Sequence, residues 1–85
     1  MTTRELTIIK AVLDYLHSLD GGQADELLIH RDIYQATDPV PSAAELKAVL
    51  AQCDAMRWIT GVPAKFTRKM KWNLNDAGEA ARLEM

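Results

Sequence analysis

The sequence predicts an α+β domain in which helical segments precede a β-hairpin and a short final helix. Three observations support this prediction. Apolar residues recur at helical spacing over residues 2–19 and again over residues 42–56. The spacing then changes to alternation over residues 57–62 and 65–74, which is typical of two strands joined by a short turn. Because 85 residues supply apolar side chains for one core, we expect a single domain spanning residues 1–85.

The first helix has a clear start and a clear end. Thr2 and Glu5 have the spacing of a capping box, in which the hydroxyl bonds an unpaired amide at the helix start. The pair Gly21-Gly22 follows the last apolar position, where glycine accepts the left-handed backbone common after helices. Ile8 and Tyr15 widen the apolar arc to about 180°. This width predicts that part of the helix meets a second subunit, as in a possible homodimer through helix 1.

Residues 24–37 leave two interpretations open. The segment LLIH could form a short strand, or the whole stretch could be one helix. We favour a brief extended piece that leads into a helix over residues 31–36. Pro39 and Pro41 then interrupt regular structure, because each proline restricts the residue before it to extended conformations.

The clearest helix covers residues 42–56 and opens with a second capping box, formed by Ser42 and Glu45. One face carries the expected core stripe, and the opposite face carries small side chains. The core stripe is Leu46, Val49, Leu50, Cys53 and Met56, and the opposite stripe is Ala44, Ala48, Ala51 and Ala55. Exposed alanine usually reflects helix propensity alone. The alternative is that small side chains let this helix lie close against a partner.

Alternation in the second strand predicts a hairpin with two different faces. The face expected to cover the core carries Phe66, Met70, Trp72 and Leu74, and the face expected to meet water carries Thr67, Lys69, Lys71 and Asn73. Trp58 should join the aromatic residues of the core, although such rings can also stack on bases. Asn75 is expected to cap the final helix over residues 76–85.

Charge is segregated along the chain. The formal net charge is −2, yet residues 57–72 hold five bases and no acid, while the remainder holds five bases and all twelve acids. The bases of that basic segment are Arg57, Lys65, Arg68, Lys69 and Lys71. A separate basic patch is compatible with DNA binding, because exposed cations can replace the counterions of phosphates. The alternative is a solubilising hairpin whose charges discourage edge-to-edge pairing.

Signals for other functions are weak. Cys53 has no second cysteine with which to form a disulfide or a thiolate metal site, and His17 and His30 have no second ligand nearby in sequence. We expect a buried thiol and surface or capping histidines. No catalytic triad, phosphate loop or zinc spacing is present, so we expect no enzymatic activity, no cofactor and no metal. Without a leader or an apolar run near the roughly 18 residues of a membrane span, a cytoplasmic protein without membrane contact is expected.

The second half of the chain resembles the winged helix-turn-helix superfamily. The stretch LAQCDAMRWITG looks like the end of a recognition helix running into the first wing strand. The stretch KMKWNLNDAGEAARL resembles the pattern Y-x-L-T-x-x-G-x-x-x-L, which is common in bacterial winged-helix regulators. The predicted order of elements is also similar. The resemblance implies a winged-helix fold and a small bacterial or phage, transcription-regulator-like protein that binds double-stranded DNA.

In that superfamily the third helix usually enters the major groove, and the wing contacts the backbone. The resemblance therefore implies that helix 42–56 is the reader. The nucleic-acid-binding residues expected on this basis are Lys65, Arg68, Lys69 and Lys71 in the wing, with Arg57, Lys47, Gln52 and Ser42 beside it. Because the reader helix exposes mainly alanines, base readout is poorly supported. A winged-helix protein–protein interaction module without DNA binding is the alternative.

Overall fold

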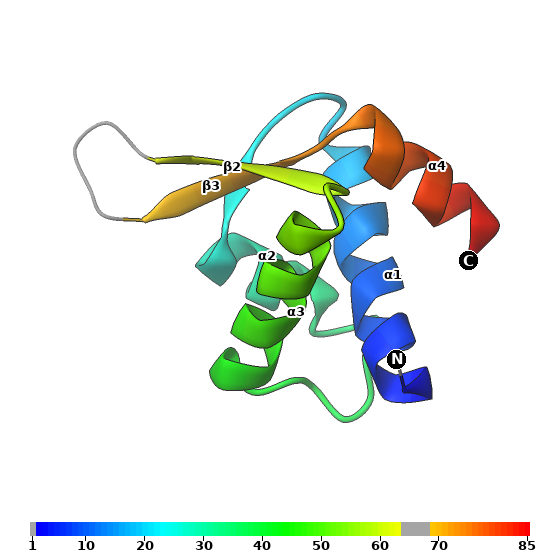
Figure 1. The fold of residues 1–85 in the computed structure, drawn as a ribbon. Coiled ribbons are helices and arrows are strands. Elements are labelled where there is room, and N and C mark those ends of the chain that lie inside the picture. The colour runs from blue at the N-terminus through cyan, green and yellow to red at the C-terminus, as the bar shows by residue number, and fades with distance from the viewer. Residues whose placement is uncertain (1, 64–68) are drawn as a thin grey trace.

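The computed structural model of this protein describes residues 2–63 and 69–85 (Figure 1). Its elements are, in order, α1 (Thr3–Ser18), β1 (Ala24–Asp25), α2 (Glu26–Ile33), α3 (Ala43–Ala55), β2 (Ile59–Pro63), β3 (Met70–Leu74) and α4 (Asp76–Glu84). The three strands form one antiparallel sheet in the order β1-β3-β2. The hairpin of β2 and β3 projects from the helices, which is the predicted winged-helix arrangement (Figure 1).

Helices α1, α3 and α4 begin at the caps that the sequence predicts. The side-chain oxygens of Thr2, Ser42 and Asn75 each accept a hydrogen bond from the amide three residues further along, at 3.1, 3.1 and 2.9 Å. Each bond satisfies an amide that has no partner inside the helix. These boundaries follow from the local sequence, which is why they are predicted closely.

The helix predicted over residues 31–36 is wrong in its limits. Helix α2 runs from Glu26 to Ile33, so the segment LLIH lies inside it. Asp25 is the reason, because its Oδ1 accepts a hydrogen bond from the Leu28 amide at 2.9 Å and so caps the helix early. The predicted extended piece is present but short, since only Ala24 and Asp25 pair with β3.

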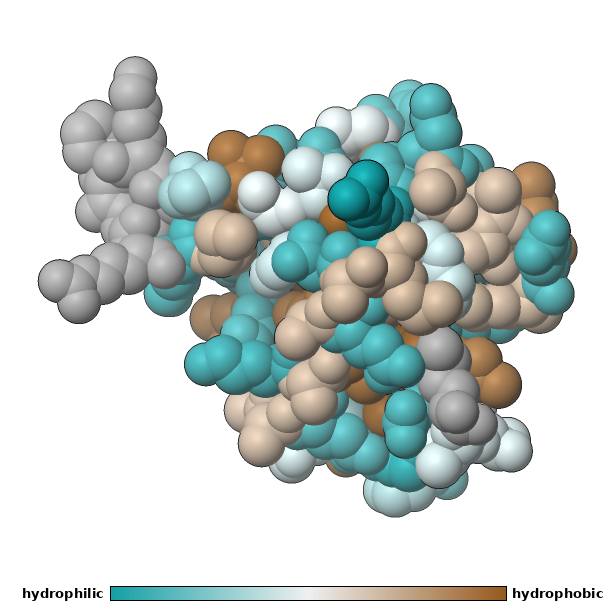
Figure 2. Space-filling view, in the orientation of Figure 1, coloured by the Kyte–Doolittle hydropathy of each residue, from teal (hydrophilic) through white to brown (hydrophobic). Residues whose placement is uncertain are grey.

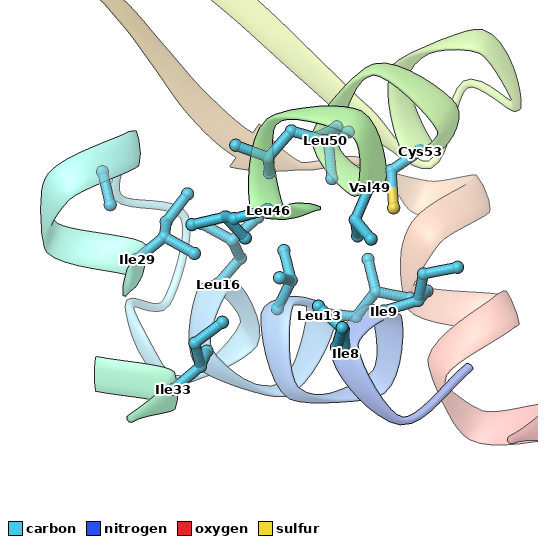
Figure 3. Packing of buried hydrophobic residues seen from close by; sticks show 13 residues of the cluster. Ile8, Ile9, Leu13, Leu16, Ile29, Ile33, Leu46, Val49, Leu50 and Cys53 are labelled. Atoms are coloured by element: carbon cyan, nitrogen blue, oxygen red, sulfur yellow. The ribbon is translucent and has the colours of Figure 1, made fainter. Parts of the chain in front are cut away.

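The core lies between the helices and the inner face of the sheet. Figure 3 shows side chains of α1 and α3 pointing toward one another, with those of α2 closing one side. The buried cluster is Ile8, Ile9, Val12, Leu13, Leu16, Ala24, Ile29, Ile33, Leu46, Val49, Leu50, Cys53 and Ile59. Each fully buried Leu, Ile or Val side chain contributes about 1.5–3 kcal/mol relative to an exposed one. The cluster therefore stabilises the helix–sheet packing.

Two residues predicted to lie in the core are exposed. Met56 is 43 % exposed, because it is the C-cap at which α3 ends and the chain turns away. Met70 is 39 % exposed, because the start of β3 extends beyond the helices that cover Trp72 and Leu74. The alternation of β3 is predicted correctly for Trp72 and Leu74, which pack against the core. Phe66 lies outside the described residues.

The wide apolar arc of α1 is covered within a single chain. Ile8 is fully buried, and Tyr15 packs against the core cluster. Helix α1 contacts α2, α3, α4 and β3, so it needs an apolar surface on several sides. The width of the arc therefore reflects the central position of α1. It does not point to a second subunit.

Helix α4 lies alongside α1 (Figure 1) and is held there by a hydrogen bond and an ion pair. His17 Nδ1 is 2.8 Å from Glu79 Oε1, and Arg82 bonds both Glu79, at 3.0 Å, and Asp14, at 3.4 Å. Hydrogen bonds from His17 and then from Arg82 hold the pKa of Glu79 below its usual range. Arg82 stands where the winged-helix pattern has its last leucine, so an ion-pair network replaces an apolar contact here.

Candidate nucleic-acid interface

Helix α3 presents different chemistry on its different sides, because successive residues turn by about 100°. Glu45 and Gln52 share one side, where the two Glu45 carboxylate oxygens accept hydrogen bonds from Arg4 of α1 at 2.8 and 3.0 Å. Lys47 and Asp54 share the opposite side. Gln52 and Lys47 are both predicted contacts, yet the structure places them on opposite sides of the helix and does not bring them together.

The outermost side of α3 is the alanine stripe of Ala44, Ala48, Ala51 and Ala55, all exposed. Figure 2 shows the corresponding pale-brown surface running between teal patches over α3. A stripe of methyl groups carries no donor or acceptor with which to read a base edge. It does allow the helix backbone to approach a flat or grooved partner closely.

Ser42 stands at the amino terminus of α3 and is exposed. Its hydroxyl oxygen is already engaged as the cap, with the Glu45 amide as donor. The hydroxyl hydrogen remains able to donate to a phosphate oxygen. The partial positive charge of the helix start adds to this capacity for an anion, although a single helix end is a weak site.

Arg57 connects α3 to β2 with an unusual backbone. Its φ is 60°, the left-handed region that favours glycine. The Arg57 amide donates to the Asp54 carbonyl and the Trp58 amide to the Cys53 carbonyl, both at 3.0 Å. This pair of bonds is a Schellman cap with an arginine in the position usually held by glycine. The exposed side chain of Arg57 therefore lies at the junction between α3 and β2.

The described cations of the wing lie on and just before β3. Lys71 alternates with Met70 and Trp72, so its exposed side chain lies on the outer face of the sheet. Lys69 precedes the strand and is exposed, and together with Met70 it lines a groove beside α3. Lys65 and Arg68, the other two predicted wing contacts, lie outside the described residues.

Acidic residues approach this basic hairpin from elsewhere in the chain. In the sheet Lys71 is the register partner of Asp25 on β1. Opposite charges in this arrangement attract and lower the local positive potential. Glu26 and Asp54 line the same groove as Lys69. The basic segment of residues 57–72 contains no acid in sequence, but it is not free of acids in space.

The groove lies between α2, α3 and β3 and has a volume of about 590 Å³. No local sequence pattern predicts this groove, because it is formed by residues from four separate elements. Its apolar lining includes Leu27, Leu46, Leu50, Ala51, Met70 and Trp72, and its charged lining includes Asp25, Glu26, Lys47, Asp54 and Lys69. The alternation of Met70 with Lys71 is the one local signal that could have indicated an apolar wall here.

The remaining candidate residues have structural roles. Burial raises the pKa of the Cys53 thiol to about 12, so it is a buried and unreactive group at neutral pH. His30 Nε2 donates to the Pro41 carbonyl at 2.8 Å and ties α2 to the segment before α3. Among the described residues, no three His, Cys, Asp or Glu side chains are grouped to hold a metal ion. Within the same residues, no helix is long and apolar enough to cross a membrane.

Comparisons with known proteins identify the fold. No family model matches the chain, and no curated protein matches it. A solved structure, described as a transcriptional regulator from Clostridium thermocellum, is similar with a TM-score of 0.80 and 16% sequence identity. The similarity covers 99% of this chain and 82% of that one. The overall likeness confirms the predicted α+β winged-helix fold.

Proposed function

We propose that this protein is a small, non-enzymatic, regulator-like protein of the bacterial or phage type that contacts duplex DNA. The contact surface is the wing, formed by β2 and β3, together with the outer side of α3. The observation that carries the proposal is that the hairpin projects beside α3 with exposed cations on it (Figure 1). A transcriptional regulator of the same fold supports it. For a protein with this role we propose a cytoplasmic location.

The proposed contacts are mainly to phosphates. Lys69, Lys71 and Arg57 are exposed at or near the hairpin, and Lys47 is exposed on α3. Lys65 and Arg68 complete the proposed set. Cations of this kind displace counterions from DNA, so each phosphate contact adds about 0.9 to the slope of log affinity against log salt concentration.

Base readout makes a small contribution in this proposal. The alanine stripe lets α3 lie in or near the major groove, but methyl groups contact only thymine methyls there. Gln52 lies on the side of α3 that faces Arg4 and Glu45, away from Lys47, and so it is poorly placed to read the same groove. The proposed binding is therefore weakly sequence-specific. It weakens steeply as salt increases.

The test is a fluorescence-anisotropy titration of labelled duplex DNA at two salt concentrations. The test variant is Lys69→Gln with Lys71→Gln, which removes two positive charges from the wing. The control is Lys10→Glu on α1, which also lowers the net charge by two but lies in an ion pair with Asp14 away from the wing. We expect the wing variant to bind at least about tenfold more weakly and to lose about 2 from the salt slope.

Two results would contradict the proposal. One is the absence of DNA binding by the native chain at low salt. The other is an equal loss of affinity in the wing variant and in Lys10→Glu, since that would make net charge, and not the wing, responsible. Circular dichroism of each variant checks that the fold is retained.

Exposed apolar residues on α2 favour a second candidate function, a winged-helix module for protein–protein contact. Leu27 and Leu28 of α2 and its C-cap Tyr34 are 59 %, 45 % and 62 % exposed, and α2 packs against α3, the helix that carries the alanine stripe. Patches of this kind often mark protein contacts. In this function DNA does not bind, and a partner recovered from lysate is lost when Ala48→Arg places a large charge on the stripe. Recovery that is unaffected by Ala48→Arg excludes the stripe as the contact.

A further inference from the structure

The groove between α2, α3 and β3 has the size and lining of a small-molecule site. Its volume of about 590 Å³ falls within the range of roughly 300–1,000 Å³ that holds drug-sized ligands. Leu46 and Leu50 form a buried floor, while Leu27 and Met70 are exposed on opposite walls. A groove with a buried apolar floor and exposed apolar walls favours a ligand that is itself largely apolar.

The wall formed by β3 is aromatic and polarisable. Met70 and Trp72 lie on the same face of the strand and both line the groove. Gly61 on β2 is the register partner of Trp72, and a Cβ there would lie 2.7 Å from Met70 Cε and 2.8 Å from Trp72 Cζ3. The absence of a side chain at Gly61 thus makes room for both residues on this wall. An indole ring and a thioether attract aromatic groups and cations.

Two carboxylates stand on different walls of the groove. Glu26 and Asp54 supply carboxylates and Lys47 and Lys69 supply ammonium groups, whereas Asp25 caps α2 and stands opposite Lys71 in the sheet. Glu26 and Asp54 lie on the α2 and α3 walls, and neither forms an ion pair within residues 2–63 and 69–85. A ligand held between these walls meets carboxylates on two sides. A positive charge placed between these two carboxylates and near the indole ring of Trp72 is therefore favoured.

We propose that this groove is a binding site for an apolar cation, such as a hydrophobic aromatic amine or onium compound of drug-like size. The apolar part rests on Leu50 and against Trp72 and Met70, and the positive charge lies between Glu26 and Asp54. The proposal goes beyond the proposed DNA contact. It concerns the protein alone, so its test does not require DNA.

Tetraphenylphosphonium and tetraphenylborate are suitable probes, because they have nearly the same shape and opposite charge. Binding to the full chain is measured by isothermal calorimetry and by the fluorescence of Trp72 and Trp58. We expect saturable binding of the cation, with the anion bound at least about tenfold more weakly. Replacing both carboxylates, as Glu26→Gln with Asp54→Asn, should reduce this preference to about twofold or less.

Two pairs of variants localise the binding. Leu27→Lys places a positive charge on the groove wall, whereas Leu28→Lys places the same charge on the neighbouring exposed leucine, which does not line the groove. Ala51→Trp fills the groove, whereas Ala55→Trp enlarges an exposed alanine outside it. We expect Leu27→Lys and Ala51→Trp to weaken tetraphenylphosphonium binding at least about tenfold and their controls to change it less than about twofold.

Several outcomes would overturn the proposal. These are no saturable binding of tetraphenylphosphonium, equal or tighter binding of tetraphenylborate, and equal weakening in a test variant and its control. Because Leu27 is exposed, Leu27→Lys is expected to fold normally even if Ala51→Trp does not. Loss of DNA binding in the wing variants leaves this test unaffected, so failure of one proposal is distinguishable from failure of the other.

Discussion

Gly78 is the residue at which the last helix and the wing approach most closely. A Cβ at this position would overlap the Trp58 carbonyl oxygen and would lie 2.7 Å from Leu74 Cδ1. That carbonyl also accepts a hydrogen bond from the Asn75 amide at 3.3 Å, so neither backbone can withdraw freely. The glycine of the winged-helix pattern therefore has a packing reason, which is the contact between α4 and the start of β2.

We expect Gly78→Ala to destabilise the protein by about 1–3 kcal/mol, since the overlap outweighs the better helix propensity of alanine. The measurement is the free energy of unfolding in urea. Ala77→Gly serves as the control, because it is exposed in the same helical turn and should cost only about 0.5–1 kcal/mol. A more stable Gly78→Ala protein would show that α4 does not pack as described.

Arg57 allows stability and DNA binding to be separated at a single position. Its left-handed backbone is strained for an arginine and unstrained for a glycine. We expect Arg57→Gly to raise the free energy of unfolding by up to about 1 kcal/mol and Arg57→Ala to leave it unchanged. Both variants remove the same positive charge, so both should weaken DNA binding equally.

The measurement pairs urea unfolding with the DNA titration for both Arg57 variants. Unequal DNA affinities would indicate that the backbone at residue 57, and not the guanidinium, controls the contact. A lower free energy of unfolding in Arg57→Gly would show that the backbone at Arg57 is not strained in the native protein. In either case the two readouts are independent, because one is measured without DNA.

At the scale of elements, the structure uses Glu45 differently from the sequence pattern. A capping box would turn this carboxylate back toward the start of its own helix. Instead it binds Arg4 across the gap between α3 and α1, and the hydrogen bond from Arg4 holds the pKa of Glu45 below its usual range. Only the serine half of the capping box is formed, so an ion pair between helices replaces a contact within one helix.

This ion pair, together with that of Glu79, makes stability depend on pH in the acid range. A carboxyl group whose pKa is lowered on folding supplies stability that is present above its unfolded pKa and is lost as pH falls through the folded value. We therefore expect the melting temperature to be constant from about pH 7 to 5 and to fall below about pH 4.5. Glu45→Gln should lower the melting temperature at pH 7 and flatten the fall. If the melting temperature of Glu45→Gln falls at acid pH as steeply as that of the native protein, Glu45 does not contribute to this pH dependence.

For the whole molecule, the position of α1 at the centre of the fold changes where a second copy could bind. Ile8 and Tyr15 pack in the core of a single chain. Leu6 on α1 and Leu83 on α4, in contrast, are 42 % and 72 % exposed. The contacts of His17 with Glu79 and of Asp14 with Arg82 show that these two helices run antiparallel. A homodimer, if formed, is therefore proposed at α1 and α4, on the side away from the wing.

Light scattering over a range of protein concentrations tests this surface. If the native chain gives a dimer mass, we expect Leu83→Glu to return it to a monomer without loss of secondary structure. Leu28→Glu, which changes an exposed leucine on α2, serves as the control. A native mass that stays monomeric at high concentration would exclude the homodimer.

The amino-acid sequence is enough to predict the caps, the limits of α1, α3 and α4, most of the core and the winged-helix order of elements. These features depend on residues a few positions apart, so local patterns are sufficient. The limits of α2 were not predicted, because the Asp25 cap competed with an ambiguous apolar run. The exposure of Met56 and Met70 was not predicted either, since it depends on where neighbouring elements end.

The surroundings of the charged side chains could not be predicted, because they depend on how distant elements pack. Asp25 precedes Lys71, and Glu26 precedes Lys69, by more than forty residues in sequence. Strand pairing nevertheless sets Asp25 opposite Lys71, and the fold sets Glu26 in the groove with Lys69. Charge segregation along a chain is therefore not charge segregation in space. Electrostatic potential depends on distance through space, and only the packing of α2, α3 and β3 brings these groups, and the groove between them, together.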